Sequence, residues 1–541
     1  IYGASEDQKA GQGSSGNINI KVDDAVLIDG KKDGLASAIF NDTEKETIGN
    51  GGDITIDSNS LYLANGARIN ASTSGLGNAG NIIVRAKNSV SLTDANIFST
   101  VEVGGIGRGG DITINSGSFF LSDGAQLSAT MRGEGKAGNV NINALDSVLL
   151  TDARILSNIE AGGIGQGGNI NINAASLSIK DTAQLQTALM EASDGKAGGR
   201  GNAGSVNIDV KGAVTIAGSI GDSRSAIYSE AKTGTVGNGG SINIKSGSLS
   251  LMDNAIIDAS TSGQGDAGSI FINASDFVTI VDSDIVSKIK ASGFGNAGQI
   301  NINAASLSLN EGAQLQTLVS EALENEPAGQ GNAGDINIDV IGAVNISGAK
   351  NKFASAILSR VEPEAVGNGG NISINSGSFA LNEGTTLETN TKGQGSAGNL
   401  TLRAKDSILI TGSYILNTVE AGGVGKGGNI DINATKLSIL DGAQVQTLVR
   451  EAVEGKPAGS GDAGNININV TDAVNISGKK NGLNSAIVSL VGTGTTGNAG
   501  NITINSGSFS LSDKAFINTS TSRTGNAGNV SVSANNFVSL V

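Results

Sequence analysis

A short glycine-anchored unit recurs along the whole chain and constrains the fold more than any other feature. In each copy, a glycine is followed by a polar residue and an aliphatic-x-aliphatic segment, as in Gly240-Ser-Ile-Asn-Ile. Self-similarity of this kind is the signature of a repeat architecture. The anchor glycines are Gly16, Gly52, Gly80, Gly110, Gly138, Gly168, Gly204, Gly240, Gly268, Gly298, Gly334, Gly370, Gly398, Gly428, Gly464, Gly500 and Gly528.

The spacing of the anchor glycines adds a second, longer period. From Gly110 onward the unit lengths cycle as 28, 30, 36 and 36 residues, so that a block of four units covers 130 residues. Equivalent blocks begin at Gly110, Gly240, Gly370 and Gly500. The segment from Gly52 to Gly110 is a shortened block that lacks both long units.

Each unit contains three short segments in which aliphatic and polar residues alternate, the pattern of half-buried β-strands. In the unit that begins at Gly240, these segments are residues 241–244, 248–251 and 255–259. The residues predicted to face inward are Ile242, Ile244, Leu249 and Leu251, and those predicted to face outward are Asn243 and Ser250. The third segment leads into a glycine-rich corner, residues 263–268, where positive φ angles cost glycine little.

A single unit can neither bury its own aliphatic residues nor pair its own backbone, whereas stacking on neighbouring units does both. The sequence therefore predicts an all-β fold, a single-stranded parallel β-helix (β-solenoid) of about 17 coils with 28–36 residues each. We expect residues 1–541 to form one continuous β-helix rod. At a strand spacing of about 4.8 Å, the stack would be roughly 75–80 Å long.

Both ends of the chain fall within a unit. Residues 1–15 correspond to the third segment and exit loop of a unit, and the chain stops at Val541 inside a second segment. A solenoid needs capping elements to cover its terminal edges, and neither end has one. The expectation is a segment of a longer chain, uncapped at both ends.

The long units keep the three segments and enlarge their connections. One type adds eight residues after the third segment, and its copies are residues 191–197, 321–327 and 451–457. The other type inserts six residues between the second and third segments, and its copies include residues 348–355 and 478–485. These protrusions are predicted to recur every fourth coil, about 19 Å apart.

Composition excludes several classes of function. The chain has no Cys and no His, which removes thiol nucleophiles, His general bases, disulfides and Cys/His metal sites. The formal net charge is −15, with Lys and Arg scattered, so nucleic acid is not an expected partner. No run of 18 apolar residues is present, so we expect no insertion into a membrane.

The segment Gly497-Asn-Ala-Gly-Asn-Ile-Thr-Ile-Asn-Ser-Gly-Ser-Phe-Ser-Leu-Ser-Asp513 resembles the repeats of filamentous-haemagglutinin-like exoproteins. It looks most like the large two-partner-secretion exoproteins of cyanobacteria, and nearly the whole chain shares the resemblance. The resemblance implies a right-handed parallel β-helix, export through an outer-membrane transporter, and an adhesive or structural role outside the cell or at its surface. The amino-terminal secretion domain that such a transporter recognises is absent from these residues.

A carbohydrate-active β-helix enzyme is the alternative function. The richest carboxylate cluster is Glu321, Glu324 and Glu326. A catalytic pair must be unique and rigidly held, yet Glu321 has block equivalents in Glu191 and Glu451 on glycine-flanked loops. A solvated charged loop is the favoured interpretation, so we predict that the chain is not an enzyme and assign no catalytic residue.

A glycine-rich run and three aromatic residues could suggest ligand binding, but a structural role is favoured for each. The run Gly104-Gly-Ile-Gly-Arg-Gly-Gly-Asp111 superficially suggests a calcium-binding β-roll, but it lacks an Asp at every ninth residue. A plain glycine turn is favoured, so no metal or cofactor is expected. Tyr62, Phe294 and Phe353 can stack on sugar rings, but isolated aromatic residues in a solenoid are more often core or ladder residues.

The outward rows of Asn, Ser and Thr are the best binding surface that the sequence predicts. Many weak hydrogen-bonding sites on a long repeat favour multivalent attachment. We therefore expect an extracellular structural or adhesive rod within a secreted or surface-attached exoprotein. Its expected partners are the secretion transporter and surface glycans or matrix, with self-association into fibres as a further expectation.

Overall fold

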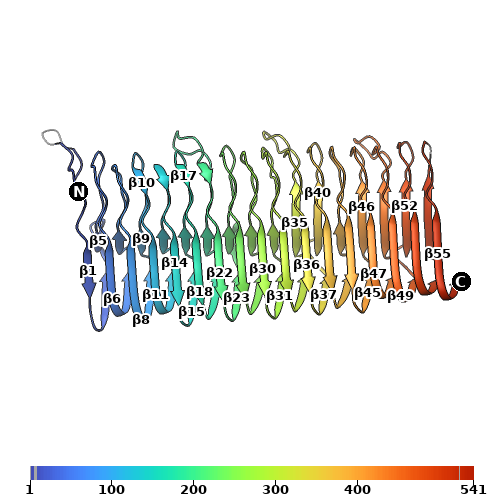
Figure 1. Cartoon of the computed structure of the whole chain (residues 1–541), viewed down its shortest axis with the longest axis horizontal. Helices are drawn as coiled ribbons and strands as arrows, with labels where there is room; N and C mark the ends of the chain where they lie inside the picture. Colours follow the sequence, from blue (N-terminus) through green and yellow to red (C-terminus); the bar gives the residue numbers. More distant parts are fainter. Residues whose placement is uncertain (1, 5–8, 523) are drawn as a thin grey trace. The chain divides into compact units, whose positions relative to one another are not determined.

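The computed structural model describes residues 2–4, 9–522 and 524–541, and within them every regular element is a β-strand. Each repeat of the sequence forms one coil. The coils divide between two compact units, Ile1–Phe271 (the first unit) and Ile272–Val541 (the second unit), and strand β30 (Ile270–Ala274) spans the boundary. In both units, equivalent strands of successive coils lie side by side (Figure 1). The single continuous rod stays a prediction.

In the first unit, three parallel ladders run through successive coils, one for each predicted strand of the coil. The first-strand ladder comprises β1 (Ile18–Lys21), β6 (Ile54–Ala64), β8 (Ile82–Thr93), β11 (Ile112–Ser122), β14 (Val140–Ala144), β18 (Ile170–Ala174), β22 (Val206–Val210) and β27 (Ile242–Ser246). The second-strand ladder comprises β2 (Ala25–Asp29), the later halves of β6, β8 and β11, then β15 (Ser147–Thr151), β19 (Ser176–Lys180), β23 (Ala213–Ala217) and β28 (Ser248–Met252). The third-strand ladder comprises β5 (Ala38–Phe40), β7 (Arg68–Asn70), β9 (Asn96–Phe98), β12 (Gln126–Ser128), β16 (Arg154–Leu156), β20 (Gln184–Gln186), β26 (Ala226–Tyr228) and β29 (Ile256–Asp258). A shorter fourth ladder comprises β10 (Ile106–Arg108), β13 (Glu134–Lys136), β17 (Ile164–Gln166) and β21 (Arg200–Asn202).

The second unit contains the same three ladders. The first-strand ladder comprises β33 (Ile300–Ala304), β36 (Ile336–Val340), β41 (Ile372–Ser376), β44 (Leu400–Ala404), β47 (Ile430–Leu440), β49 (Ile466–Ser477), β53 (Ile502–Leu511) and β55 (Val530–Leu540). The second-strand ladder comprises β31 (Phe277–Val281), β34 (Ser306–Asn310), β37 (Ala343–Ser347), β42 (Ser378–Asn382), β45 (Ser407–Thr411) and the later halves of β47, β49, β53 and β55. The third-strand ladder comprises β32 (Asp284–Val286), β35 (Gln314–Val319), β40 (Ala356–Val361), β43 (Thr386–Glu388), β46 (Tyr414–Val419), β48 (Gln444–Val449), β52 (Ala486–Val491) and β54 (Phe516–Thr521).

Backbone pairing joins equivalent positions of neighbouring coils, so that like residues stack. In β27, Ile242 pairs with Val206 of the preceding coil, and in β28, Leu249 pairs with Val214. The four predicted inward residues of this coil are all buried, and Asn243 and Ser250 are partly exposed. The predicted all-β parallel β-helix is confirmed, together with the inward and outward faces of its strands.

The anchor glycines are needed because successive coils approach each other closely at this position. A Cβ at Gly370 would overlap the carbonyl oxygen of Gly334 in the preceding coil. A Cβ at Gly268 would likewise overlap the carbonyl oxygen of Gly240. The expected positive φ occurs at Gly265, at 148°, but not at Gly268, so the sequence interpretation of the corner was only partly correct. Steric exclusion of a side chain, rather than backbone conformation, explains the anchor row.

The inserts between the second and third strands are antiparallel hairpins, where the sequence predicted loops. The hairpins are β3–β4 (Lys31–Lys32, Leu35–Ala36), β24–β25 (Ser219–Ile220, Ser223–Arg224), β38–β39 (Ala349–Lys350, Phe353–Ala354) and β50–β51 (Lys479–Lys480, Leu483–Asn484). In β38–β39, the turn residues Asn351 and Lys352 have φ angles of 50° and 72°. Positive φ at both residues is the requirement of a type I′ turn, whose twist matches that of the flanking strands.

Buried hydroxyl and amide groups fasten the third strand to the anchor row, a feature that the sequence analysis missed. The Ser359 hydroxyl accepts a hydrogen bond from the Gly370 N–H at 2.8 Å and donates one to the Gly334 carbonyl at 3.3 Å. Asn417 makes the equivalent contact with the Gly398 carbonyl at 2.7 Å. These side chains satisfy backbone groups of the corner that the strand ladders leave without partners.

The interior of the second unit provides a first test of the fold. Ile372 has no exposed surface and pairs with Ile336 and Leu400 of the two neighbouring coils. We expect Ile372→Asp to lower the free energy of unfolding of these coils by about 4 kcal/mol, because it places a charge among aliphatic side chains. Hydrogen exchange of the peptides that contain β36, β41 and β44 measures the effect. Ser373→Asp, on the outer face of the same strand, is the control, and equal protection in both variants would contradict the inward assignment.

Two glycines of one coil separate the steric requirement from the conformational one. Gly384 has a φ of 75° and no atom within 4 Å of the position that a Cβ would take, whereas a Cβ at Gly370 would overlap Gly334. We expect Gly384→Ala to cost about 1 kcal/mol and Gly370→Ala to cost about 3 kcal/mol or more, because the coils must separate. Chemical denaturation of both variants checks the order, and equal costs would show that the close approach is not what selects glycine.

Candidate functional site

The polar residue that follows each anchor glycine has a structural role. In the second unit, the Asn371 Oδ1 accepts the backbone N–H of Asn399 in the next coil at 2.9 Å. The backbone N–H of Asn371 donates in turn to the Asp335 Oδ1 at 2.7 Å. The same contact recurs in the first unit, where the Asn139 N–H donates to the Asp111 Oδ1 at 2.7 Å. We call these residues the corner row. Their side-chain oxygens accept backbone N–H groups and so continue the backbone ladder through the corner.

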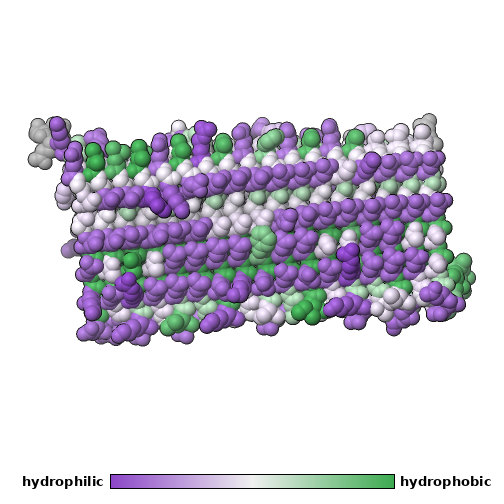
Figure 2. Space-filling view, viewed as in Figure 1, coloured by the Kyte–Doolittle hydropathy of each residue, from purple (hydrophilic) through white to green (hydrophobic). Residues whose placement is uncertain are grey.

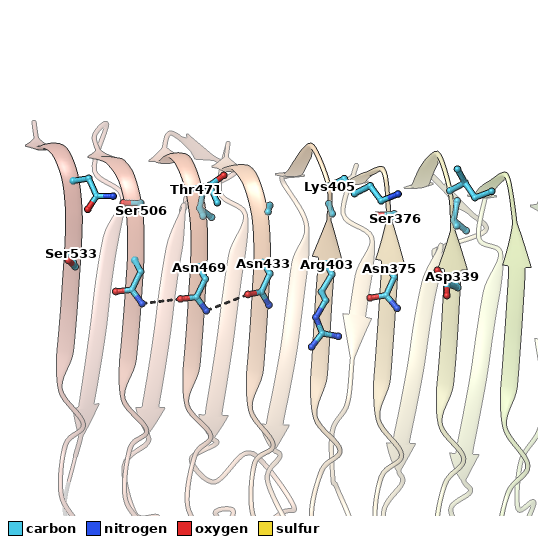
Figure 3. Close-up of a pocket in the computed structure, with 17 residues that line it drawn as sticks. Asp339, Asn375, Ser376, Arg403, Lys405, Asn433, Asn469, Thr471, Ser506 and Ser533 are labelled. Carbon is cyan, nitrogen blue, oxygen red and sulfur yellow. Dashed lines mark hydrogen bonds between the residues drawn. The ribbon is translucent and has the colours of Figure 1, made fainter.

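A second row of amides lies five residues after the anchor glycine, on the outer face of the first-strand ladder. The Asn505 Nδ2 donates to the Asn469 Oδ1 at 2.9 Å, and the Asn469 Nδ2 donates to the Asn433 Oδ1 at 3.4 Å (Figure 3). In Figure 2, hydrophilic side chains form purple rows that cross successive strands. Each amide still presents donor and acceptor capacity to solvent.

A groove of about 960 Å³ runs beside this amide row in the second unit. One side is formed by the row itself, and the other by residues two positions later, among them Lys405, Thr471 and Asn535. Between them lie small buried residues such as Ala404 and Ala434. The groove thus follows the bend between the first and second strands across several coils.

Two cations in this groove have no ion-pair partner among the described residues. Arg403 stands in the amide row between Asn375 and Asn433, and Lys405 lies across the groove from it (Figure 3). At the position of Arg403 in the first unit, Arg85 pairs with Asp57 at 3.1 Å. The difference arises one coil earlier, because Asn375 stands where an aspartate would neutralise the guanidinium. The groove therefore combines amides with uncompensated positive charge.

The first unit has a smaller groove of about 470 Å³ at the same bend. Its lining includes Lys21, Lys87 and Leu145, together with the paired Arg85 and Asp57. This ion pair occupies the arginine, but Lys21 and Lys87 take part in no ion pair of the described residues, so the smaller groove also presents positive charge, with the carboxylate of Asp23 beside it. The sequence analysis missed both grooves. The pattern Arg-Ala-Lys at residues 85–87 and 403–405 is the signal that could have indicated them, since residues two apart on a strand share a face.

The acidic residues considered for catalysis lie elsewhere in the coil. Glu321 and Glu324 are exposed on the loop after β35, and Glu326 on the same loop is partly exposed. This loop follows the third strand, whereas the groove lies between the first and second strands. Glu191 and Glu451 occupy equivalent exposed loop positions in their own coils.

No group of three or more Asp and Glu residues in the described part of the chain is arranged to hold a metal ion. Asp111, the acidic residue of the run that resembled a calcium-binding turn, contacts the next coil instead. Its Oδ1 accepts from both the backbone N–H and the side-chain amide of Asn139, at 2.7 and 3.0 Å.

The three aromatic residues named from the sequence lie on the surface, so none is a core residue, whereas the alternative expectation of a ladder position holds for Tyr62, which pairs with Leu27 and Ser91 of the neighbouring coils. The exposed fractions are 41% for Tyr62, 62% for Phe294 and 67% for Phe353. Hydrogen bonds from the side chains of Ser60 and Ser89 lower the pKa of the Tyr62 phenol below its ordinary value. Tyr62 occupies an outward position of a strand, Phe353 lies on a hairpin, and Phe294 lies in a loop where it forms an isolated bridge with Gln330.

No protein-family model, no curated protein and no solved structure matches the chain. Within the described residues, the structure holds no helix with the length and apolar character needed to cross a lipid bilayer.

A substitution in the corner row tests its structural role independently of the groove. We expect Asn429→Ala to destabilise the second unit by about 1–3 kcal/mol, because the Asn465 N–H, which donates to the Asn429 Oδ1 at 2.9 Å, loses its acceptor. Asn429→Asp is the control, since it keeps an acceptor oxygen and its neighbours in the row, Asn399 and Asn465, are uncharged. Thermal unfolding measures both, and equal destabilisation by Ala and Asp would contradict the acceptor role.

Proposed function

We propose that this chain is an extracellular structural and adhesive segment of a large secreted exoprotein, and that its groove binds acidic polysaccharide. The observation that carries the proposal is the groove of the second unit, in which a row of amides is joined by the unpaired cations Arg403 and Lys405. The resemblance of residues 497–513 to filamentous-haemagglutinin-like repeats supports the extracellular location and export through an outer-membrane transporter.

The chemistry of the groove suits a glycan chain. Side-chain amides offer both donors and acceptors, which match the mixed hydrogen-bonding character of sugar hydroxyls. The amide row repeats at each coil, about every 4.8 Å, so that one extended chain can make several weak contacts at once. Arg403 and Lys405 add charge-assisted hydrogen bonds to a carboxylate or sulfate group.

The groove supports binding rather than bond cleavage. Asp339 is the one carboxylate among its described lining residues, whereas glycoside hydrolysis ordinarily uses two facing carboxyl groups. We therefore propose no enzymatic role. A fall in the viscosity of a bound polysaccharide solution during incubation would favour the enzyme instead.

Binding to polygalacturonate, with neutral dextran as comparator, tests the proposed function. We expect the double variant Arg403→Gln, Lys405→Gln to weaken polygalacturonate binding by about tenfold, because two charge-assisted hydrogen bonds are lost. Binding should also weaken as salt is raised. The double variant Lys426→Gln, Lys514→Gln, at two exposed positions outside the groove lining, is the control for the same change in net charge. Unchanged binding in the Arg403→Gln, Lys405→Gln variant, or an equal loss in the control, would remove the groove as the site.

The location has its own test. Mass spectrometry of peptides shaved from intact cells should find this sequence in the surface fraction, within a longer polypeptide. Recovery of these peptides only from the cytoplasmic fraction would overturn the extracellular assignment.

A further inference from the structure

The second unit carries two kinds of protrusion that differ in charge. The acidic loops are residues 321–327 and 451–457, and the basic hairpins are residues 349–354 and 479–484. The loops appear in yellow and orange beyond the strand ends in Figure 1. Each pair is 130 residues apart, which is one block of four coils. Acidic loops and basic hairpins therefore repeat at the same spacing, about 19 Å along the stack.

The charges of the acidic loops are exposed and have no ion-pair partner among the described residues. The first loop carries Glu321, Glu324 and Glu326, and the second carries Glu451 and Glu454 beside Lys456. All of these side chains are exposed except Glu326, which is partly exposed. None takes part in the ion pairs of the second unit, which involve other residues.

The basic hairpins present the opposite charge. Lys352, Lys479 and Lys480 are exposed and take part in no ion pair of the described chain. Lys350 is bound to Asp282 at 2.7 Å, which holds its hairpin against the neighbouring coils. Each hairpin therefore retains uncompensated positive charge, at the turn residue Lys352 in the first and on the strand Lys479–Lys480 in the second.

Each protrusion also exposes one large apolar side chain. On the acidic loops, Leu323 is 62% exposed and Val453 is 54% exposed. On the basic hairpins, Phe353 is 67% exposed and Leu483 is 42% exposed. An apolar residue surrounded by like charges is the usual layout of a small docking surface, in which the apolar contact supplies affinity and the charges supply orientation.

Both protrusions are fastened to the preceding coil, so that their positions are set before any partner binds. The Ser292 N–H donates to the Pro327 carbonyl at 2.7 Å, and the Gly422 N–H donates to the Pro457 carbonyl at 2.8 Å. On the other side, the Gly312 N–H donates to the Ser355 hydroxyl, next to the first hairpin, at 3.0 Å. Such preorganisation lowers the entropic cost of association.

The loops and hairpins of one molecule stand at opposite ends of the third strand. A hairpin ends directly before β40 begins at Ala356, whereas a loop begins just after β35 ends at Val319. A six-residue strand is about 20 Å long, so a hairpin and a loop of the same copy do not meet. Two copies lying side by side can bring one edge against the other.

We propose that the basic hairpins of one copy dock on the acidic loops of a second copy of this chain. Phe353 and Leu483 pack against Leu323 and Val453, and the surrounding lysines face the glutamates. Because both edges share one spacing, two contacts form together, and the second is favoured by the high effective concentration that the first creates. The contact is heterologous, because it joins two different edges. A pair of copies therefore keeps one hairpin edge and one loop edge free, to which further copies can add laterally. It goes beyond the proposed function, since it requires no polysaccharide and does not involve the groove.

The first unit provides an internal comparison. Its hairpin β24–β25 carries Asp222 beside Arg224, and the Arg224 Nη2 donates to the Ala255 carbonyl at 3.2 Å. This hairpin therefore lacks the uncompensated charge of its counterparts. The other hairpin of the first unit, β3–β4, carries the exposed Lys31 and Lys32, but no basic hairpin lies 130 residues from it among the described strands. The paired contact that we propose therefore belongs to the second unit.

Charge reversal on each edge tests the contact. Variant A carries Lys352→Glu, Lys479→Glu and Lys480→Glu, and variant B carries Glu321→Lys, Glu324→Lys and Glu451→Lys. We expect sedimentation of the 541-residue chain to show self-association that weakens with salt, and each variant alone to associate at least about tenfold more weakly. A mixture of A and B should associate again, because the reversed edges attract each other. Circular dichroism checks that both variants keep the β fold.

Two further measurements distinguish this contact from association through the groove or through strand edges. The double variant Phe353→Ala, Leu483→Ala should weaken association while the charges stay intact, and the double variant Arg403→Gln, Lys405→Gln should leave association unchanged while polysaccharide binding falls. A wild-type chain that stays monomeric at low salt would overturn the proposal. So would variants A and B that associate as strongly as the wild type, as expected for stacking through strand edges, or an A and B mixture that does not associate.

Discussion

The close approach of successive coils at the anchor row is the constraint on which the rest of the structure depends. At this row the carbonyl of one glycine lies where the next glycine would carry a side chain, as for Gly334 and Gly370. The approach brings the corner amides of adjacent coils within reach of the Asn and Asp oxygens that follow, and of the buried hydroxyls of the third strand. Aliphatic packing fills the interior, but the glycine row sets how closely one coil can lie on another.

The parts of the fold that depend on one coil alone were predictable from the sequence. Alternation correctly placed Ile242 and Leu249 inside and Asn243 outside, because a strand's two faces follow directly from its period. The hairpins were missed although residues 481–482 are Asn-Gly, a favoured type I′ pair, because no long alternating segments flank them. The role of Ser359 was also missed, since a lone hydroxyl in a strand gives no sign of the carbonyl that it contacts.

The candidate site was less predictable, because its character depends on residues in neighbouring coils. Arg85 and Arg403 occur in the same Arg-Ala-Lys pattern, yet one is neutralised by Asp57 and the other stands beside Asn375. The deciding residue lies in the preceding coil and is not a near neighbour in the chain. Only the stacking register shows which side chains become neighbours. One residue in the preceding coil therefore decides whether the arginine at this position forms a structural ion pair or stays unpaired.

The corner row also gives the stack a direction. Where Asn or Asp follows the anchor glycine, the side-chain oxygen belongs to the earlier coil and the N–H to the later one, as for Asn371 and Asn399. The earlier coil thus supplies the acceptor oxygen, and the later coil supplies the N–H that donates to it. A chain that becomes available from its amino-terminal side can template each new coil on the one before.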